Sequence, residues 1–247
     1  ETKGGSVSGV RLDTGEFIAA DIVVSNSDAT LTNDLLSQPD QKLMPKITDS
    51  PSLAGFVLLL ALDGNTEGIA HHNVWFPENY NAEFDAIFGK APTPPIDPAI
   101  YACVPDDPQM RPSPDCESWF ILVNAPRHDS SGSNGFNWNA PGCKERYAQQ
   151  VLDILAARGT DIRPRVKWQE IRTPADLERD TMAPGGSIYG ASSNGPRAAF
   201  TRPANQSNIS GLYLVGGSSH PGGGLPLVGM GAEITAELIG RAEKPNP

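Results

Sequence analysis

The sequence predicts an α/β (α+β) fold, and two observations lead to this expectation. A short apolar strand, a glycine-rich loop and a helical pattern follow one another within residues 212–240. Apolar stretches also lie close together in the middle of the chain, at residues 52–62, 71–76 and 117–126, with helical patterns beside them. Strands grouped in this way are typical of an antiparallel sheet, so we expect a mixed or antiparallel sheet there.

Composition excludes several classes of protein. The chain has 247 residues, 38% of them hydrophobic, and a net charge of -10, which disfavours a nucleic-acid backbone as partner. Cys103, Cys116 and Cys143 form an odd set without CxxC spacing, so we expect no disulfide framework and no metal. No apolar run reaches the roughly 20 residues of a membrane-spanning helix, and no signal peptide is recognisable. We therefore expect a cytoplasmic protein whose membrane contact is peripheral.

Residues 6–25 predict a β-hairpin followed by a third strand. Apolar and polar positions alternate around the Asp-Thr-Gly turn at residues 13–15. The Ile-Val-Val run within residues 21–25 favours a buried strand in the interior of a sheet. Residues 26–28, Asn-Ser-Asp, offer capping side chains, which predicts a helix directly after them.

The middle of the chain predicts strands, a proline-rich loop and two helices. Prolines crowd residues 90–114, which excludes a long helix and predicts a loop around short strands. Residues 144–159 have helical periodicity and end at Gly159. A strand is expected at residues 163–171, and Thr173 followed by Pro174 predicts the start of a second helix.

The glycine-rich loop is the most informative stretch. Residues 212–215 predict a buried strand that ends at Gly216 and Gly217, and residues from Leu225 onward predict a helix with one apolar face. Free backbone N–H groups at a helix N-terminus favour an anion or an electron-rich ring edge, and glycines allow a close approach to the backbone. A tight turn without a ligand is the alternative interpretation of such a loop.

Five stretches of the sequence resemble one known family, in order. They include VSGVRLDTGEFIAADIVVSNSDA, TPADLERDTMAPGGSIYG and FTRPANQSNISGLYLVGGSSHPGGGLPLVGMGAEITAEL, and together the five span nearly the whole chain. These stretches resemble the C-terminal part of the bacterial carotenoid desaturases (dehydrogenases) of the phytoene desaturase type, within the flavin amine-oxidase-like superfamily. The last stretch is the most specific of them.

This resemblance implies a flavoprotein with two domains. Residues 1–48 and 180–247 would form a partial, Rossmann-like FAD-binding domain, and residues 49–179 would form the substrate-binding domain. The implied reaction is the desaturation of a carotenoid or other isoprenoid polyene by hydride transfer to FAD. The implied flavin-facing positions are Gly216, Gly217, His220, Pro221, Gly222, Gly223, Gly224, Leu225, Pro226 and Val228.

His220 is the candidate catalytic residue of the loop. Beside the flavin it would contact the ring or support proton loss from the substrate, while its structural alternative is hydrogen bonding to loop backbone. A hydrocarbon substrate has no polar group that would position a base, so no catalytic base is assigned.

One departure from the family pattern is large. The dinucleotide fingerprint GxGxxG is absent from these residues, and the family carries it in its N-terminal part. We therefore expect the C-terminal portion of a longer enzyme, whose partner is the missing N-terminal FAD-binding segment and which by itself binds FAD weakly. The alternatives are a catalytically incompetent module that binds an isoprenoid or a partner subunit, and a flavin-dependent polyene isomerase.

Other residues have structural explanations beside the functional ones. Adjacent histidines on a strand point to opposite sides, and no carboxylate or cysteine adjoins His71 and His72 in the sequence, so a structural role is favoured over metal binding. Arg197 and Arg202 fit either a phosphate or flavin contact or a surface or capping role.

The remaining candidates are apolar or nucleophilic. The runs FVLLLAL and ESWFILV fit a polyene tunnel or an ordinary core, and Ile96, Ile100 and Tyr101 offer a surface that could enter a bilayer. Ser218 and Ser219 lack the GxSxG elbow of a hydrolase.

Overall fold

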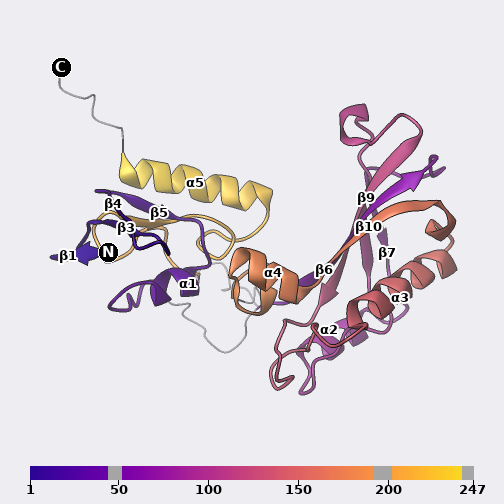
Figure 1. Ribbon diagram of the computed structural model, residues 1–247, viewed down its shortest axis with the longest axis horizontal. Coiled ribbons are helices and arrows are strands. Elements are labelled where there is room, and N and C mark those ends of the chain that lie inside the picture. Colours follow the sequence, from indigo (N-terminus) through magenta and orange to yellow (C-terminus); the bar gives the residue numbers. More distant parts are fainter. Residues whose placement is uncertain (44–51, 192–201, 241–247) are drawn as a thin grey trace. The chain divides into compact units, whose positions relative to one another are not determined.

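The computed structural model describes residues 1–43, 52–191 and 202–240, and the chain forms two compact units (Figure 1). The first unit comprises Glu1–Ser52, Thr181–Pro184 and Ile188–Pro247. The second comprises Leu53–Asp180 and Gly185–Ser187. Both ends of the chain therefore contribute to the first unit, and nearly all of the second unit is one continuous segment.

The second unit is built on a five-stranded antiparallel sheet with the strand order β10-β6-β9-β8-β7 (Figure 1). Its strands are β6 (Ala54–Asp63), β7 (His72–Trp75), β8 (Ile100–Cys103), β9 (Cys116–Ala125) and β10 (Val166–Arg172). The long pair β6–β9 runs in register from Ala54 opposite Ala125 to Asp63 opposite Cys116. The expected antiparallel sheet in the middle of the chain is confirmed.

One face of this sheet packs against helix α3 (Cys143–Ala157) and an aromatic cluster. The ring of Phe56 on β6 lies 5.4 Å from that of Trp138 and 4.9 Å from that of Tyr147. The buried residues of α3 include Tyr147, Val151 and Leu155, as the periodicity predicts, whereas Ile154 is only partly buried. Because the apolar stripe of α3 faces this cluster, burial of that stripe stabilises both helix and sheet.

Two shorter helices flank the sheet strands in sequence. Helix α4 (Pro174–Thr181) begins with the expected Thr173 cap, whose Oγ1 accepts from the N–H of Asp176 at 3.2 Å. Helix α2 (Tyr80–Phe88) was not among the expected elements. It follows the capping residue Asn79, whose side chain accepts from Ala82, and it ends at Gly89. Short 3₁₀ turns lie at Pro108–Met110, Arg163–Arg165 and Pro184–Gly186.

A buried carboxylate anchors a loop of the second unit. Glu117 on β9 accepts hydrogen bonds from the backbone N–H of Thr66 at 2.7 Å and from Nε1 of Trp119 at 3.0 Å. Burial alone would raise the pKa of Glu117, but these bonds and the nearby guanidinium of Arg165 bring that pKa below its ordinary value. Glu117 therefore stabilises the folded unit in its charged form.

Within the described residues, the first unit holds small sheets and two helices. Its elements are β1 (Thr2–Lys3), β2 (Ser6–Val7), β3 (Gly9–Arg11), β4 (Phe17–Ala19), β5 (Val23–Ser25), α1 (Ala29–Asp34), β11 (Leu212–Leu214) and α5 (Leu225–Ile239). The β3–β4 pair confirms the predicted hairpin, and Asp28 caps α1 as expected. Strands β5 and β11 pair in parallel, with Leu212 opposite Val23.

The expectation that residues 21–25 form a fully buried strand is wrong. Val24, in the centre of β5, is 45% exposed. Within the described residues β5 pairs only with β11, so it lies at an edge of a two-stranded sheet rather than in a sheet interior. The core of this unit is correspondingly small, with Ala29, Leu43, Leu212 and Leu214 as its buried members.

Candidate functional site

The glycine-rich loop begins where the parallel pair β5–β11 ends. The N–H of Val215 donates to the carbonyl of Ser25 at 2.9 Å, which continues the pairing to the first residue of the loop. Gly216 follows with a φ of +99°, and a Cβ at this position would lie 2.5 Å from Oδ1 of Asn26. The chain therefore turns away from the sheet at a residue where a side chain is both strained and obstructed.

Arg202 holds this loop from the inside of the unit. The residue is only 7% exposed, and its Nη1 donates to the carbonyl oxygens of Tyr189 and Gly217, each at 2.8 Å. Burial lowers the pKa of this guanidinium, and the carboxylate of Asp28 opposes that shift. Arg202 is thus a buried clamp on backbone carbonyls rather than the surface residue considered from the sequence. Arg197 lies outside the described residues.

Two glycines let the loop lie close to its neighbours. A Cβ on Gly222 would lie 3.1 Å from Nε of Arg202, and one on Gly223 would lie 2.5 Å from the ring of Tyr189. Both positions are therefore packed against the segment that supplies the clamp. Packing within the unit therefore explains why residues without a side chain occupy these two positions.

The backbone of His220 is fixed on both sides. Its N–H donates to the carbonyl of Pro203 at 2.9 Å, and its carbonyl accepts from Nδ2 of Asn205 at 2.8 Å. Asn205 is buried and also donates to the carbonyl of Leu214 at 3.2 Å, so it links the end of β11 to the far side of the loop. The peptide bond from His220 to Pro221 is cis.

A cavity of about 390 Å³ adjoins the His220 side of the loop. Its lining residues are Lys42, Arg202, Ala204, Asn205, Gln206, His220 and Leu238. Two cationic side chains and an imidazole thus border one cavity in the first unit. Such a lining is suited to a polar or anionic group rather than to a hydrocarbon.

The N-terminus of α5 is open. Gly224 precedes the helix with a φ of +102°, no side chain among the described residues caps the helix there, and Leu225 is 88% exposed. The glycines inside the helix differ: a Cβ on Gly229 would meet nothing within 4 Å, whereas one on Gly231 would lie 3.2 Å from the carbonyl of His220. The first turn therefore presents an uncovered surface, and the second packs onto the loop.

The two serines of the loop have structural roles. Oγ of Ser218 accepts from the N–H of Ala29 at 3.0 Å, at the start of α1. Ser219 is fully buried, and its Oγ donates to the carbonyl of Gly216 at 3.0 Å. Both hydroxyls are thus engaged with backbone, which explains them without hydrolytic chemistry.

The loop is supported by residues that sequence reasoning did not assign. Asn205 and Asn26 contact it directly, and the buried Asp40 accepts from the backbone N–H of Asn208 at 2.6 Å and of Lys42 at 3.0 Å. Burial would raise the pKa of Asp40, but its hydrogen bonds lower it. Asn205 is 9 and 15 residues from Leu214 and His220, and Asp40 is 168 residues from Asn208, so no local sequence pattern identifies these contacts.

The apolar runs of the second unit form its core. Phe56, Leu58, Leu60, Trp119 and Ile121 all belong to the buried cluster of the sheet. This burial accounts for one face of both runs, whereas Phe120, which lies between Trp119 and Ile121 on β9, is 38% exposed.

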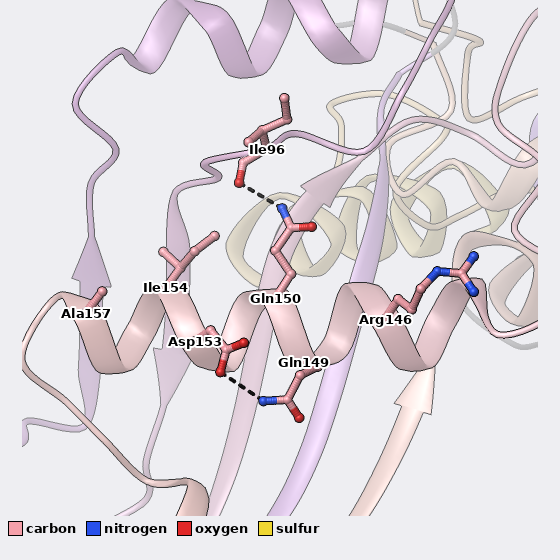
Figure 2. Close-up of a pocket in the computed structure, with 7 residues that line it drawn as sticks. All are labelled: Ile96, Arg146, Gln149, Gln150, Asp153, Ile154 and Ala157. Carbon is pink, nitrogen blue, oxygen red and sulfur yellow. Dashed lines mark hydrogen bonds between the residues drawn. The ribbon is translucent and has the colours of Figure 1, made fainter.

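The surface proposed from sequence for bilayer contact is divided by the fold. Ile96 is 85% exposed, whereas Ile100 is fully buried on β8, so the two residues cannot enter a bilayer together. Ile96 instead borders an open hollow of about 540 Å³ along α3, where its carbonyl accepts from Nε2 of Gln150 at 2.8 Å (Figure 2). No helix within the described ranges has the length and apolarity required to cross a membrane.

Comparison with known proteins identifies relatives over nearly the whole chain. The chain is 34% identical over 236 residues to a 1-hydroxycarotenoid 3,4-desaturase of Flavobacterium sp. (strain P99-3), covering 94% of this chain and 46% of that protein. It is 31% identical over 248 residues to a 4,4'-diaponeurosporene oxygenase of Staphylococcus aureus (strain USA300), covering 97% of this chain and 48% of that protein.

No family model matches the sequence. The chain spans about half the length of the curated relatives it matches. Over that shared length it is a homologue of the bacterial carotenoid desaturases and oxygenases, and the resemblance inferred from its motifs is confirmed.

Proposed function

We propose that this chain supplies the flavin-facing half of an FAD-dependent oxidoreductase that desaturates a carotenoid or another long isoprenoid polyene. The relatives named above support a carotenoid-modifying oxidoreductase. The cofactor, the hydride transfer and the roles of individual residues are the finer part of this proposal.

The observation that carries the proposal is the open first turn of α5 behind a rigid glycine loop. A Cβ placed on Gly224 would have no atom within 4 Å, and within the described residues no side-chain hydrogen bond caps the helix at this position. Unsatisfied N–H groups and the positive end of the helix dipole favour negative charge, such as that on the N1 edge of a reduced isoalloxazine. Bound FAD would supply the hydride acceptor.

The residues of the loop fit a flat ligand in different ways. Gly224, Leu225, Pro226 and Val228 would border the ring, because they form or adjoin the uncovered first turn. Gly216, Gly217, Gly222 and Gly223 would set the path of the backbone, since their packing and contacts lie within the unit. His220 and Pro221 hold the loop against Gly231. His220 also borders the cationic cavity, which is suited to a polar part of a cofactor.

Partner and location are part of the same proposal. Apolar side chains of the first unit are exposed, including Ile18, Ile22, Val24, Leu225 and Met230. We infer that a further FAD-binding segment covers part of this surface and supplies the pyrophosphate cradle that GxGxxG provides in related enzymes. The substrate would be a carotenoid taken from a membrane by a cytoplasmic, peripherally attached enzyme.

The absence of GxGxxG from these residues favours a second candidate function, a module that binds an isoprenoid or a partner subunit without catalysis. A flavin-dependent polyene isomerase is the other alternative, because such an enzyme would also hold a flavin. Product analysis under air and under reducing conditions separates this isomerase from a desaturase, because only desaturation consumes an oxidant.

The test is FAD binding by two proteins. The first is the chain of 247 residues, and the second is the same chain extended upstream through a GxGxxG segment. Both are titrated with FAD, followed by flavin fluorescence, and their flavin absorbance is measured after gel filtration. We expect stoichiometric flavin only in the extended protein. Failure of both proteins to retain flavin overturns the proposal, and retention by the shorter one overturns the inferred need for a second segment.

A further inference from the structure

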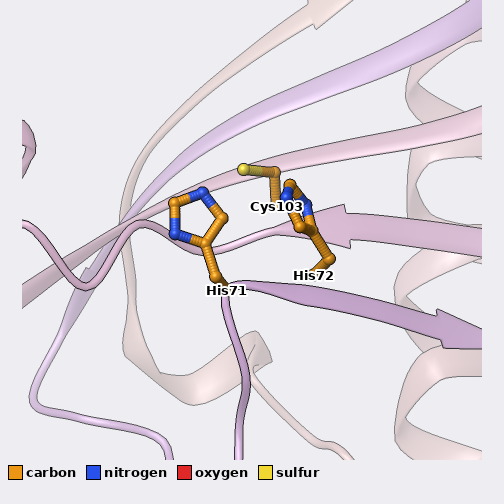
Figure 3. A group of neighbouring side chains, drawn as sticks. All are labelled: His71, His72 and Cys103. Atoms are coloured by element: carbon orange, nitrogen blue, oxygen red, sulfur yellow. The ribbon is translucent and has the colours of Figure 1, made fainter.

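Three potential metal ligands converge at one end of the sheet in the second unit. His72 begins β7, Cys103 ends β8, and these two residues are direct partners in the antiparallel register. His71 immediately precedes β7. One ligand atom from each of the three side chains lies within 4.8 Å of the other two (Figure 3).

Both sequence arguments against a metal fail at this place. Alternation of side chains applies within a strand, but His71 lies before β7, and its ring centroid is only 4.5 Å from that of His72. The cysteine missing from the neighbouring sequence comes from the adjacent strand instead. A carboxylate is also present, since Asp106 Oδ1 lies 3.3 Å from Nδ1 of His71.

Neighbouring groups orient both imidazoles in the manner of a metal site. Nδ1 of His71 faces the carboxylate of Asp106, and Nδ1 of His72 lies 2.9 Å from the hydroxyl of Tyr101. These contacts leave Nε2 of each ring for a metal ion, and such outer partners fix the tautomer of metal-binding histidines. The backbone is held as well, because the N–H of Val104 donates to the carbonyl of His71 at 2.8 Å.

We propose that His71, His72 and Cys103 form a binding site for a zinc ion. Two imidazoles and one thiolate match the preference of Zn²⁺ for nitrogen and sulfur ligands, and the thiol proton is released to solvent on binding. Zinc–ligand distances of about 2.0–2.3 Å place tetrahedral ligands roughly 3.3–3.8 Å apart. The three ligand atoms lie up to 4.8 Å apart, so they must approach one another by on the order of 1 Å to bind the ion. The histidine side chains are exposed and are therefore able to move by this amount.

The fourth position is open to water, since the carboxylate of Asp106 faces Nδ1 of His71. Because β7 is the last strand in the sheet order and β8 is its neighbour, the ion would cross-link the two strands. A ligand that binds only the folded state raises stability by mass action, so zinc should stabilise this unit. The site is separate from the glycine loop and does not depend on flavin.

The test uses the untagged chain after treatment with a chelator. Titration with Co²⁺, a spectroscopic substitute for Zn²⁺, is expected to give one equivalent of binding. It should produce the near-ultraviolet thiolate charge-transfer band and the visible d–d bands of a tetrahedral ion. Zinc is then expected to displace cobalt and to raise the melting temperature.

Matched variants locate the ion. Cys103→Ser is expected to abolish the charge-transfer band, and His71→Ala and His72→Ala are expected to weaken metal affinity at least tenfold. Cys116→Ser and His128→Ala are the controls and should bind as the parent does. Melting of each variant without metal confirms that it is folded. Absence of the thiolate band, binding that survives Cys103→Ser, or equal loss in Cys116→Ser overturns the proposal.

Discussion

Nη1 of Arg202 donates a hydrogen bond of 2.8 Å to the carbonyl oxygen of Gly217, at the start of the glycine loop. The same atom holds the carbonyl of Tyr189. One buried cation therefore joins the loop to a separate stretch of the unit. Both this contact and the glycines of the loop therefore fix the path of its backbone.

Replacement of this arginine tests the clamp. Arg202→Lys keeps the charge, but its side chain is one bond shorter and does not bring its ammonium to the position of Nη1 between the two carbonyls. Because hydrogen bonds to charged groups contribute about 1.5–3 kcal/mol each, we expect Arg202→Lys to lower the free energy of unfolding by about 2–3 kcal/mol. Urea unfolding measures this loss. Arg146→Lys is the matched control, since Arg146 is exposed and reaches one carbonyl, that of Pro141, at 3.2 Å. Equal losses in the two variants would refute the clamp.

Alanine variants of two glycines with positive φ distinguish the cost of a steric clash from the cost of backbone strain. Gly211 has a φ of +81° and a Cβ there would lie 2.3 Å from the carbonyl oxygen of Asp21, whereas Gly224 has a φ of +102° and open space. Backbone strain at these positive φ values costs on the order of 1–3 kcal/mol for either alanine variant. Gly211→Ala must also displace backbone that pairs with Val23, so we expect at least about 2 kcal/mol of further loss. Thermal unfolding of both variants provides the comparison, and similar melting temperatures would contradict it.

The acid side of the stability profile depends on Glu117. Its pKa in the folded unit lies below the ordinary 4.5, so its charged form stabilises the fold above that pH. The contribution is lost as pH falls through the lowered folded pKa. We therefore expect Glu117→Gln to cost about 1–3 kcal/mol near neutral pH and much less at the acid end.

Urea midpoints measured across this pH range provide the check. Glu67→Gln is the control, because Glu67 is exposed and lies beside the same loop residue, Thr66. If the difference in urea midpoint between the parent and Glu117→Gln stays constant with pH, then Glu117 does not contribute to the loss of stability in acid.

The open face of α5 makes the flavin proposal testable at one residue. Gly229 is exposed, and a Cβ placed there would have no atom within 4 Å, so a leucine side chain fits at this position. Leucine also favours the helix over glycine by about 1 kcal/mol. In the form of the protein that retains FAD, we expect Gly229→Leu to weaken FAD binding at least tenfold while the melting temperature holds or rises. Fluorescence titration measures the affinity. Ala236→Leu, also exposed and two turns further along α5, should bind as the parent does. Parent-like affinity in Gly229→Leu would exclude this face as the flavin surface.

Local signals predicted much of the fold. The turn at residues 13–15, the caps at Asp28 and Thr173, and the apolar stripe of α3 all depend on residues a few positions apart, and each is confirmed. Helix α2 had a comparable signal in Asn79, Gly89 and the i, i+4 spacing of Tyr80, Phe84 and Phe88. The expected proline-rich loop covered residues 90–114, and residues 80–88 before it received no assignment.

The failures arise where strand pairing decides the outcome. Burial of β5 depends on how many strands flank it, which a run of Ile and Val does not reveal. The meeting of His72 with Cys103 depends on the register between β7 and β8. Within the candidate site, the strand, the loop glycines and the helix were predictable, whereas the Arg202 clamp and the Asn205 bridge required three-dimensional contacts.

The division of the chain between its two units has a consequence for synthesis. Strand β5 is made before the second unit, but its partner β11 follows only after that unit. A chain growing from its N-terminus can thus complete the second unit while β5 still lacks its partner. Closing the parallel pair is a late event of high contact order, and until then the apolar residues of β5 are exposed to other chains.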